Sequence, residues 1–136
     1  MRRSVKHIIS ASVLPLFSGI SFLAAAQSVA PMTQEIRGFN SQFVAQVEIS
    51  NPYDSPQKAN VRVYSSDWLP IRPIYLSNAN RILAPNQKVI VTALIPFARE
   101  NHRVVYICNS ITPRMGGVGQ SYRGEVCGKV SAQRLS

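Results

Sequence analysis

The sequence has few of the residues that build catalytic or metal centres. Its 136 residues include two histidines, two cysteines and 6 acidic residues against 15 lysines and arginines. The carboxylates are scattered, so no pair is indicated for acid and base hydrolysis. Beyond residue 26 the one histidine is His102, beside Arg99 and Glu100 in an expected exposed turn, without partners for nucleophilic or metal chemistry. We therefore predict a protein that is not an enzyme and needs no metal or other cofactor.

Phosphate and nucleic-acid sites are not indicated either. The glycine-rich run from Met115 to Gly119 has no Gly-Lys-Ser/Thr sequence and no helical pattern after it, which is typical of a hairpin turn. The basic residues stand singly, so no dedicated nucleic-acid patch is expected, only weak attraction to acidic envelope polymers. These scattered residues include Arg37, Lys58, Arg62, Arg72, Arg81, Lys88, Arg99 and Arg103.

The N-terminus has the pattern of a secretory signal. Arg2, Arg3 and Lys6 precede an uncharged apolar run over residues 8–26, which ends in three alanines. We predict a signal peptide over residues 1–26 and a domain over 27–136, working in the periplasm, or secreted to the cell surface, without stable membrane insertion. An uncleaved anchor is the alternative, because the run is nearly long enough to span a bilayer. Removing residues 1–26 leaves 12 basic against 6 acidic residues, a charge of +6.

The rest of the chain alternates apolar and polar residues in short runs bounded by Pro, Asn and Gly, which indicates β-strands. The run Val89 to Ile95 is almost wholly apolar and predicts a central, well-buried strand. No helical periodicity, repeat or linker is present. Seven strands are expected: around Thr33 to Ile36, Phe43 to Ser50, Val61 towards Trp68, Ile74 to Leu76, Val89 to Ile95, Arg103 to Ser110 and Tyr122 to Gln133. This spacing predicts an all-β fold, an immunoglobulin-like β-sandwich.

The two cysteines predict one disulfide. In an oxidising compartment an even pair is typical of a bridge, and the spacing supports neither a metal site nor a redox pair. If Cys108 and Cys127 face each other across an antiparallel pair, the centre of the pairing falls between Gly117 and Val118, inside the glycine-rich turn. We therefore expect a disulfide that joins the last two strands. No early cysteine exists, so the inter-sheet bridge of antibody domains is excluded.

Two segments carry a resemblance to a known family. Residues 44–51 end the second expected strand in Ser50-Asn51, and residues 81–87 form a Leu-x-Pro turn before the fifth. Together with the order of the strands, they resemble the N-terminal immunoglobulin-like domain of PapD-type periplasmic pilus chaperones over most of the exported part. Asn86 stands where that family usually has glycine.

The resemblance implies a mode of binding. In the family a basic pair holds the C-terminal carboxylate of a client pilin, and alternating hydrophobic residues of the last strand complete the client's sheet. Lys129 matches the family's lysine, and Val126 and Val130 supply part of the alternation, with Gly128 between them. The first-strand arginine has no clear match, and Arg37 is the nearest candidate. The chain stops at Ser136, so we expect a single-domain relative without the second domain.

We therefore predict an exported, chaperone-like or pilus-assembly module that binds another exported protein, pilin-like or of the envelope, by β-strand addition. The alternative is a structural or accessory subunit of a surface appendage or envelope layer, which would self-associate. Around the final hairpin, Arg103, Tyr122 and Arg123 are further candidates for surface recognition. Trp68 is expected in the core, as is usual for a tryptophan on the third strand of a sandwich. The alternative is that Trp68, with Leu69, is an aromatic residue that binds a ligand.

Overall fold

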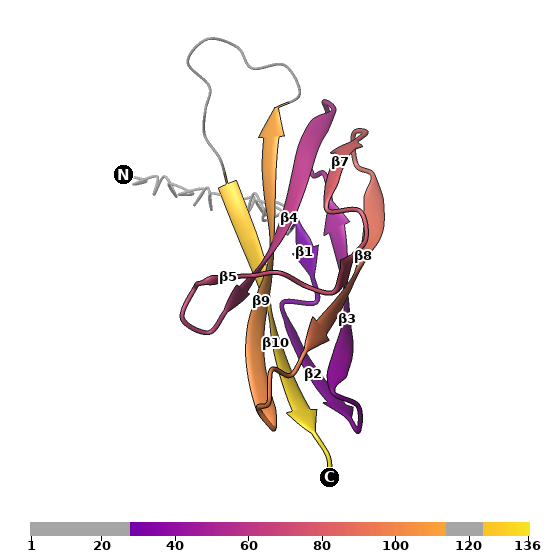
Figure 1. Ribbon diagram of the computed structural model, residues 1–136. Helices are drawn as coiled ribbons and strands as arrows, with labels where there is room; N and C mark the ends of the chain where they lie inside the picture. Colours follow the sequence, from indigo (N-terminus) through magenta and orange to yellow (C-terminus); the bar gives the residue numbers. More distant parts are fainter. Residues whose placement is uncertain (1–27, 114–123) are drawn as a thin grey trace, which may run out of the picture.

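The computed structural model describes residues 28–113 and 124–136, and over these residues the chain is all-β (Figure 1). The predicted signal peptide, Tyr122 and Arg123 lie outside the described residues. The strands are β1 (Val29–Ala30), β2 (Thr33–Gly38), β3 (Gln42–Ser50), β4 (Gln57–Ser65), β5 (Pro70–Ile71), β6 (Tyr75–Leu76), β7 (Asn80–Leu83), β8 (Lys88–Pro96), β9 (His102–Pro113) and β10 (Gly124–Arg134). Within the described ranges there is no helix of the length and apolarity that a bilayer crossing needs.

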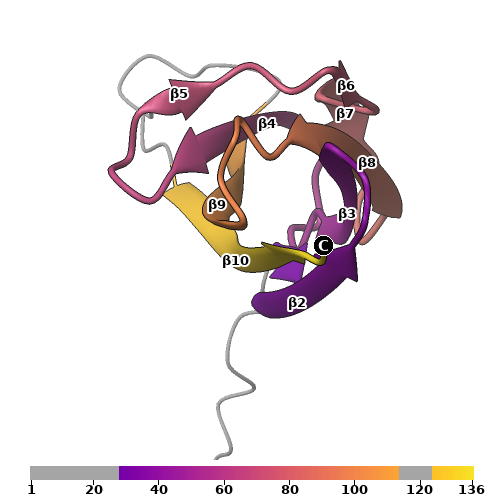
Figure 2. The same ribbon diagram turned by 60° about the horizontal axis from the view of Figure 1, so that its bottom comes forward.

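The strands form two sheets that enclose the core (Figure 2). The smaller sheet has the order β1-β3-β8-β6, and the larger has the order β2-β10-β9-β4-β5, with β7 paired to β4. The immunoglobulin-like sandwich predicted from the strand spacing is confirmed. Beyond the seven expected strands, the structure has three short ones, β1, β5 and β7.

The core consists of the inward-facing halves of the alternating strands. On β3, Phe43, Ala45, Val47 and Ile49 are at most 3% exposed, as the alternation predicts. Phe97, which directly follows β8, is fully buried and packs against Phe43 with ring centroids 4.9 Å apart. The opposing sheet contributes Ala59, Val61, Val63, Val105, Ile107, Val130 and Ala132.

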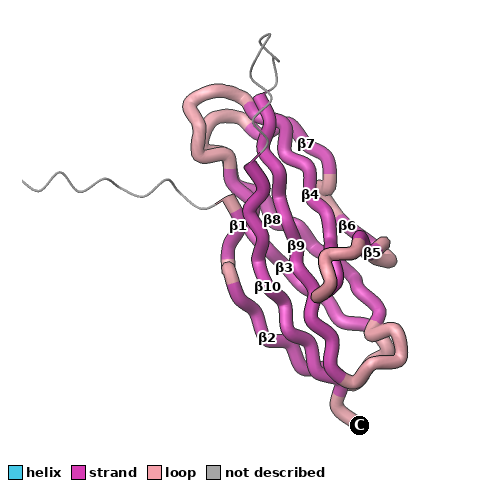
Figure 3. The backbone as a smooth tube through the Cα atoms, turned by 90° about the vertical axis from the view of Figure 1, so that its left-hand side faces the viewer, coloured by secondary structure: helices cyan, strands magenta, loops and turns pink. Residues whose placement is uncertain are grey.

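The beginning of the described chain changes sheets. β1 pairs antiparallel with β3, the Ala30–Pro31 peptide bond is cis, and β2 then pairs in parallel with β10. Figure 3 shows β1 and β2 following each other beside β10, with a short loop between them. Pairing of β2 with β10 begins only at Thr33 and Lys129, so β2 covers one half of β10.

The two segments that suggested the family resemblance are bonded to each other. Asn51 is fully buried, and its Nδ2 donates to the carbonyl oxygens of Leu83 and Ala84 at 3.2 and 3.1 Å. In the neighbouring turn, Asn86 has a φ of 58°. Glycine and asparagine are the residues that adopt this left-handed conformation most readily, so asparagine can replace the glycine usual in the family.

Two expectations about burial are wrong. The run from Val89 to Ile95 is not buried on both faces, because β8 lies in a sheet with one face on the core and one in solvent, and Ile90 is 50% exposed. Trp68 is not a core residue. It lies in the turn between β4 and β5, where its side chain is 56% exposed.

Candidate functional site

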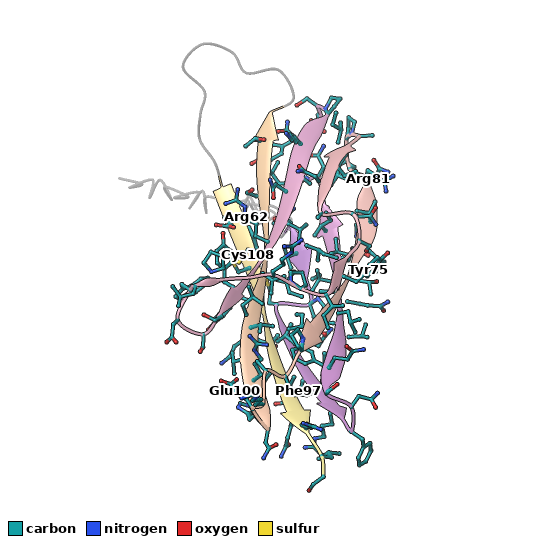
Figure 4. The ribbon with its side chains drawn as sticks, in the orientation of Figure 1. Arg62, Tyr75, Arg81, Phe97, Glu100 and Cys108 are labelled. Atoms are coloured by element: carbon teal, nitrogen blue, oxygen red, sulfur yellow. A yellow bond between two sulfur atoms is a disulfide. The ribbon has the colours of Figure 1, made fainter. Side chains whose placement is uncertain are left out.

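The final hairpin is held by the predicted disulfide. Cys108 on β9 and Cys127 on β10 lie directly opposite each other, with Cα atoms 4.0 Å apart, and their sulfurs are bonded (Figure 4 labels Cys108). The short Cα distance is typical of a pair whose backbone groups do not bond to each other. Ile107 on β9 and Val130 on β10 face the core, so Cys108 and Cys127, at alternate positions, face outward, and the bridge fixes β10 against β9.

One edge of β10 has no neighbouring strand in the part of the chain that the structure describes. β9 pairs with β10 from Gly124 to Gln133, whereas β2 pairs on the other side only from Lys129 onward. Gly124 to Gly128 therefore form an open edge, which we call the β10 edge. An open edge offers unpaired backbone donors and acceptors to another strand.

The direction of these groups follows from one hydrogen bond. The N–H of Lys129 donates to the carbonyl oxygen of Met32 at 2.8 Å, so it points away from β9. Backbone groups alternate in direction along an antiparallel strand, and therefore Glu125 and Cys127 also direct their N–H and C=O groups away from β9. These two residues present the backbone groups of the β10 edge.

Gly128 marks where the edge closes. A Cβ atom at this residue would lie 2.9 Å from the carbonyl oxygen of Pro31 and 3.3 Å from Cγ1 of Val29. Only glycine lets the chain between β1 and β2 approach β10 so closely. The glycine that interrupts the expected hydrophobic alternation therefore has a structural role.

Lys129 lies immediately beyond this point, on the outer face of the sheet. It is exposed and is paired with Thr33 on one side and Tyr106 on the other. A hollow of about 460 Å³ is lined by Thr33, Gln34, Glu35, Lys129 and Ser131. Within residues 28–113 and 124–136 the one ion pair joins Lys88 and Glu48, 3.3 Å apart, so the Lys129 ammonium group is available to a ligand.

The other expected site residues do not gather around Lys129. Val130 is 1% exposed and belongs to the core, and Val126 is half-buried and packs against the core. Arg37 pairs with Gln133, four positions farther along both strands than Thr33 and Lys129, so Thr33 occupies the place opposite the lysine. Arg103 pairs with Ala132, near the far end of β10, and its guanidinium group donates to the carbonyl oxygen of Pro96.

An aromatic group that was not predicted from the sequence lies on the same outer face. The Trp68 ring stacks on that of Tyr106, with centroids 4.4 Å apart and planes at 12°, and Tyr64 lies 6.1 Å from Trp68. The Tyr64 hydroxyl donates to Oε1 of Glu125 on β10 at 3.3 Å. The sequence could have predicted one member of this group. Tyr64 alternates with Val61 and Val63 on β4, so its side chain is expected on the outer face.

No protein-family profile matches the sequence, and no curated protein does. Among solved structures, the chain is similar to the E. coli chaperone DraB, with a TM-score of 0.63 and 14% identity over 80% of this chain and 55% of that one. It is also similar to a chain in the complex of the Salmonella enterica SafA pilin with the SafB chaperone, with a TM-score of 0.61 and 15% identity over 82% and 56% of the two chains.

A third similar structure is the PapD-like domain 7 of human CEP192, with a TM-score of 0.56 and 12% identity over 99% of this chain and 98% of that one. The chain thus spans just over half the length of the chaperone chains and nearly all of the CEP192 domain. The similarity confirms the predicted resemblance to PapD-type periplasmic chaperones at the level of the fold.

Proposed function

We propose that this domain is a periplasmic, non-enzymatic, chaperone-like module that binds another exported protein by adding the β10 edge to the partner's sheet. The observation that carries the proposal is the open stretch from Gly124 to Gly128 in a strand that is otherwise paired on both sides. The predicted signal over residues 1–26 provides the route to the periplasm.

The edge is well suited to act as a template. The disulfide between Cys127 and Cys108 holds the β10 edge at a fixed distance from β9. The edge is therefore ordered before binding, and little conformational entropy is lost when a partner strand pairs with it. Glu125 and Cys127 together offer two N–H and two C=O groups, and each backbone hydrogen bond contributes about 1 kcal/mol net. Such a short ladder binds weakly on its own, so the partner needs a further contact.

Lys129 supplies that contact. It stands at the closed end of the edge, beside the hollow formed with Thr33 and Ser131, and it has no ion-pair partner in the described ranges. A strand that pairs along the β10 edge reaches this ammonium group where β2 blocks further pairing. An acidic side chain or a chain terminus at that point would form a charge-assisted hydrogen bond.

The similarity to solved structures supports the proposal that this domain binds an exported protein. A PapD-type fold also occurs in a chain of the SafA pilin and SafB chaperone complex, so this fold is compatible with capture of an exported subunit. We propose a pilin-like or envelope protein as the partner here.

The test compares two substitutions at one residue. Glu125→Pro removes the N–H that points out from the edge, and proline is tolerated on an edge strand where the N–H faces solvent. Glu125→Ala keeps this N–H and removes only the carboxylate with its bond to Tyr64. In a periplasmic pull-down, we expect partners captured by the wild type and Glu125→Ala to be lost with Glu125→Pro and reduced with Lys129→Ala.

Equal capture by all four proteins would refute binding through the β10 edge. Size-exclusion chromatography of the purified domain then decides the alternative role. A soluble complex with one partner agrees with a chaperone-like module, whereas concentration-dependent self-association agrees with a structural subunit of an envelope layer or appendage.

A further inference from the structure

Trp68 is held in a rigid turn that exposes it. The Trp68 N–H donates to the carbonyl oxygen of Ser65 at 3.0 Å, and the Leu69 N–H donates to Oγ of Ser65 at 3.1 Å. The N–H of Ser65 donates in return to the carbonyl oxygen of Leu69 at 2.8 Å. Trp68 itself has a φ of 61°, a conformation that costs energy for a bulky residue and persists only where its surroundings fix it.

The indole ring is therefore a fixed plane on the surface. One of its faces stacks on Tyr106 at 4.4 Å, yet the side chain remains 56% exposed. A large aromatic ring that a turn holds in solvent gives up the stabilisation that burial of its apolar surface would bring. Such exposed rings are typical of recognition surfaces. The turn before β5 projects from the side of the sandwich (Figure 1).

A polar hollow lies near this plane, and Asp67, which precedes Trp68, is part of its lining. It has a volume of about 270 Å³ and lies between the β4–β5 turn and the first residues of β9; Figure 4 shows Glu100 at the lower end of β9. Its lining is Ser65, Ser66, Asp67, Glu100, His102, Arg103 and Val104. Asp67 precedes Trp68 in the chain, and Val104 lies on the outer face of β9 two residues before Tyr106, so the hollow and the aromatic plane share one surface.

The polar groups of the hollow keep much of their hydrogen-bonding capacity. In the part of the chain that the structure describes, the carboxylates of Asp67 and Glu100 form no ion pair and accept no side-chain hydrogen bond. Arg103 is anchored through one nitrogen on Pro96, and His102 Nε2 lies 2.9 Å from Oγ of Ser131. Two carboxylates, one guanidinium group and one imidazole ring therefore line one hollow, with no ion pair among them in the described ranges.

We infer that the hollow and the free indole face together bind a pyranose saccharide. A pyranose ring has an apolar C–H face that fits against an aromatic plane. Its hydroxyl groups can donate hydrogen bonds to carboxylates, accept them from a guanidinium group, and bond to an imidazole ring. The two carboxylates beside a single guanidinium group favour a neutral sugar over an anionic polymer. The site lies on the outer face next to Lys129, which is paired with Tyr106, but saccharide binding there does not depend on the function proposed above.

The protein has a single tryptophan, so its fluorescence reports on the site. The probes are the tetramer of N-acetylglucosamine and maltotetraose, titrated into the purified exported domain, with glycerol as the polyol control. We expect a saturable change in the Trp68 emission with at least one saccharide, at dissociation constants on the order of 1 mM, and none with glycerol.

Variants locate the binding. By calorimetry or NMR titration, Asp67→Asn should weaken saccharide binding about tenfold, because a hydrogen bond to a charged group is lost. Trp68→Ala should abolish binding, whereas Tyr75→Ala, also 56% exposed but on β6 of the other sheet, should leave it unchanged. Thermal unfolding of each variant shows that it is folded.

Failure of both saccharides to change the emission would overturn the proposal. Unchanged binding by a folded Trp68→Ala variant would also overturn it, as would an equal response to glycerol. Because this assay contains no protein partner, its outcome is distinguishable from failure of the β10 edge.

Discussion

Gly128 and Gly38 provide a matched pair of substitutions that tests how the β10 edge is closed. Gly128 lies in β10 against the chain between β1 and β2, and Gly38 ends β2. A methyl group at Gly128 would lie 2.9 Å from the carbonyl oxygen of Pro31, whereas one at Gly38 meets nothing within 4 Å. Both positions receive the same change, Gly→Ala, so intrinsic propensity and chain entropy largely cancel.

The magnitude follows from the contact. The obstructing atom is backbone, so residues 29–32 must move away from β10, and overpacking of this kind costs about 1–3 kcal/mol. A Gly→Ala change without strain also lowers the conformational entropy of the unfolded chain, which stabilises the folded state by about 0.4–1 kcal/mol. Gly128→Ala should therefore lower the free energy of unfolding by about 1–2 kcal/mol, and Gly38→Ala should leave it unchanged or slightly higher.

Urea unfolding of the disulfide-intact domain measures both values under one condition. NMR should also show that Gly128→Ala shifts the amides of Val29 and Met32, which lie in the displaced segment and are distant from residue 128 in sequence. If the two variants were equally stable and these amides were unperturbed, the close approach of β1 and β2 to β10 would be wrong, and with it the boundary of the open edge.

Three further variants test the packing of the domain. Replacing Cys108 and Cys127 by alanine should cost about 3 kcal/mol in thermal unfolding, since the bridge closes a loop between positions 19 apart in sequence; an unchanged melting temperature would contradict this. Asn51→Ala should cost about 2 kcal/mol or more in urea unfolding, because three carbonyl oxygens lose the Asn51 Nδ2 donor. Asn109→Val should raise the free energy of unfolding by about 1 kcal/mol, because Asn109 is fully buried and both its amide atoms lack a hydrogen-bond partner among the described residues; a loss of stability would show that the amide is needed.

The sequence predicted the parts of the fold that depend on local pattern. Alternation identified β3 and its core face, because one residue in two must be apolar where a sheet covers a core. The cysteine positions predicted the register of the last two strands, since a direct cross-strand pair fixes the centre of the hairpin in the turn. Both signals are local or depend on two residues only.

The features that the sequence did not predict depend on contacts between residues far apart in the chain. Trp68 was expected in the core, but the chain leaves β4 at Ser65, so Trp68 falls in the turn and stacks on Tyr106 from outside. Val130 was expected to contact a partner, but it faces inward at 1% exposure. The place of Lys129 opposite Thr33 depends on the parallel pairing of β2, which joins strands from the two ends of the domain.

Residue-resolved amide hydrogen exchange, on the free domain and on the complex with a captured partner, tests whether the β10 edge is the docking strand. In the free domain, the Glu125 and Cys127 amides should exchange without protection, while the Lys129 amide is protected by its bond to Met32. On binding, the first two should become protected. If they were already protected in the free domain, or stayed unprotected in the complex, the partner would not bind by pairing with β10.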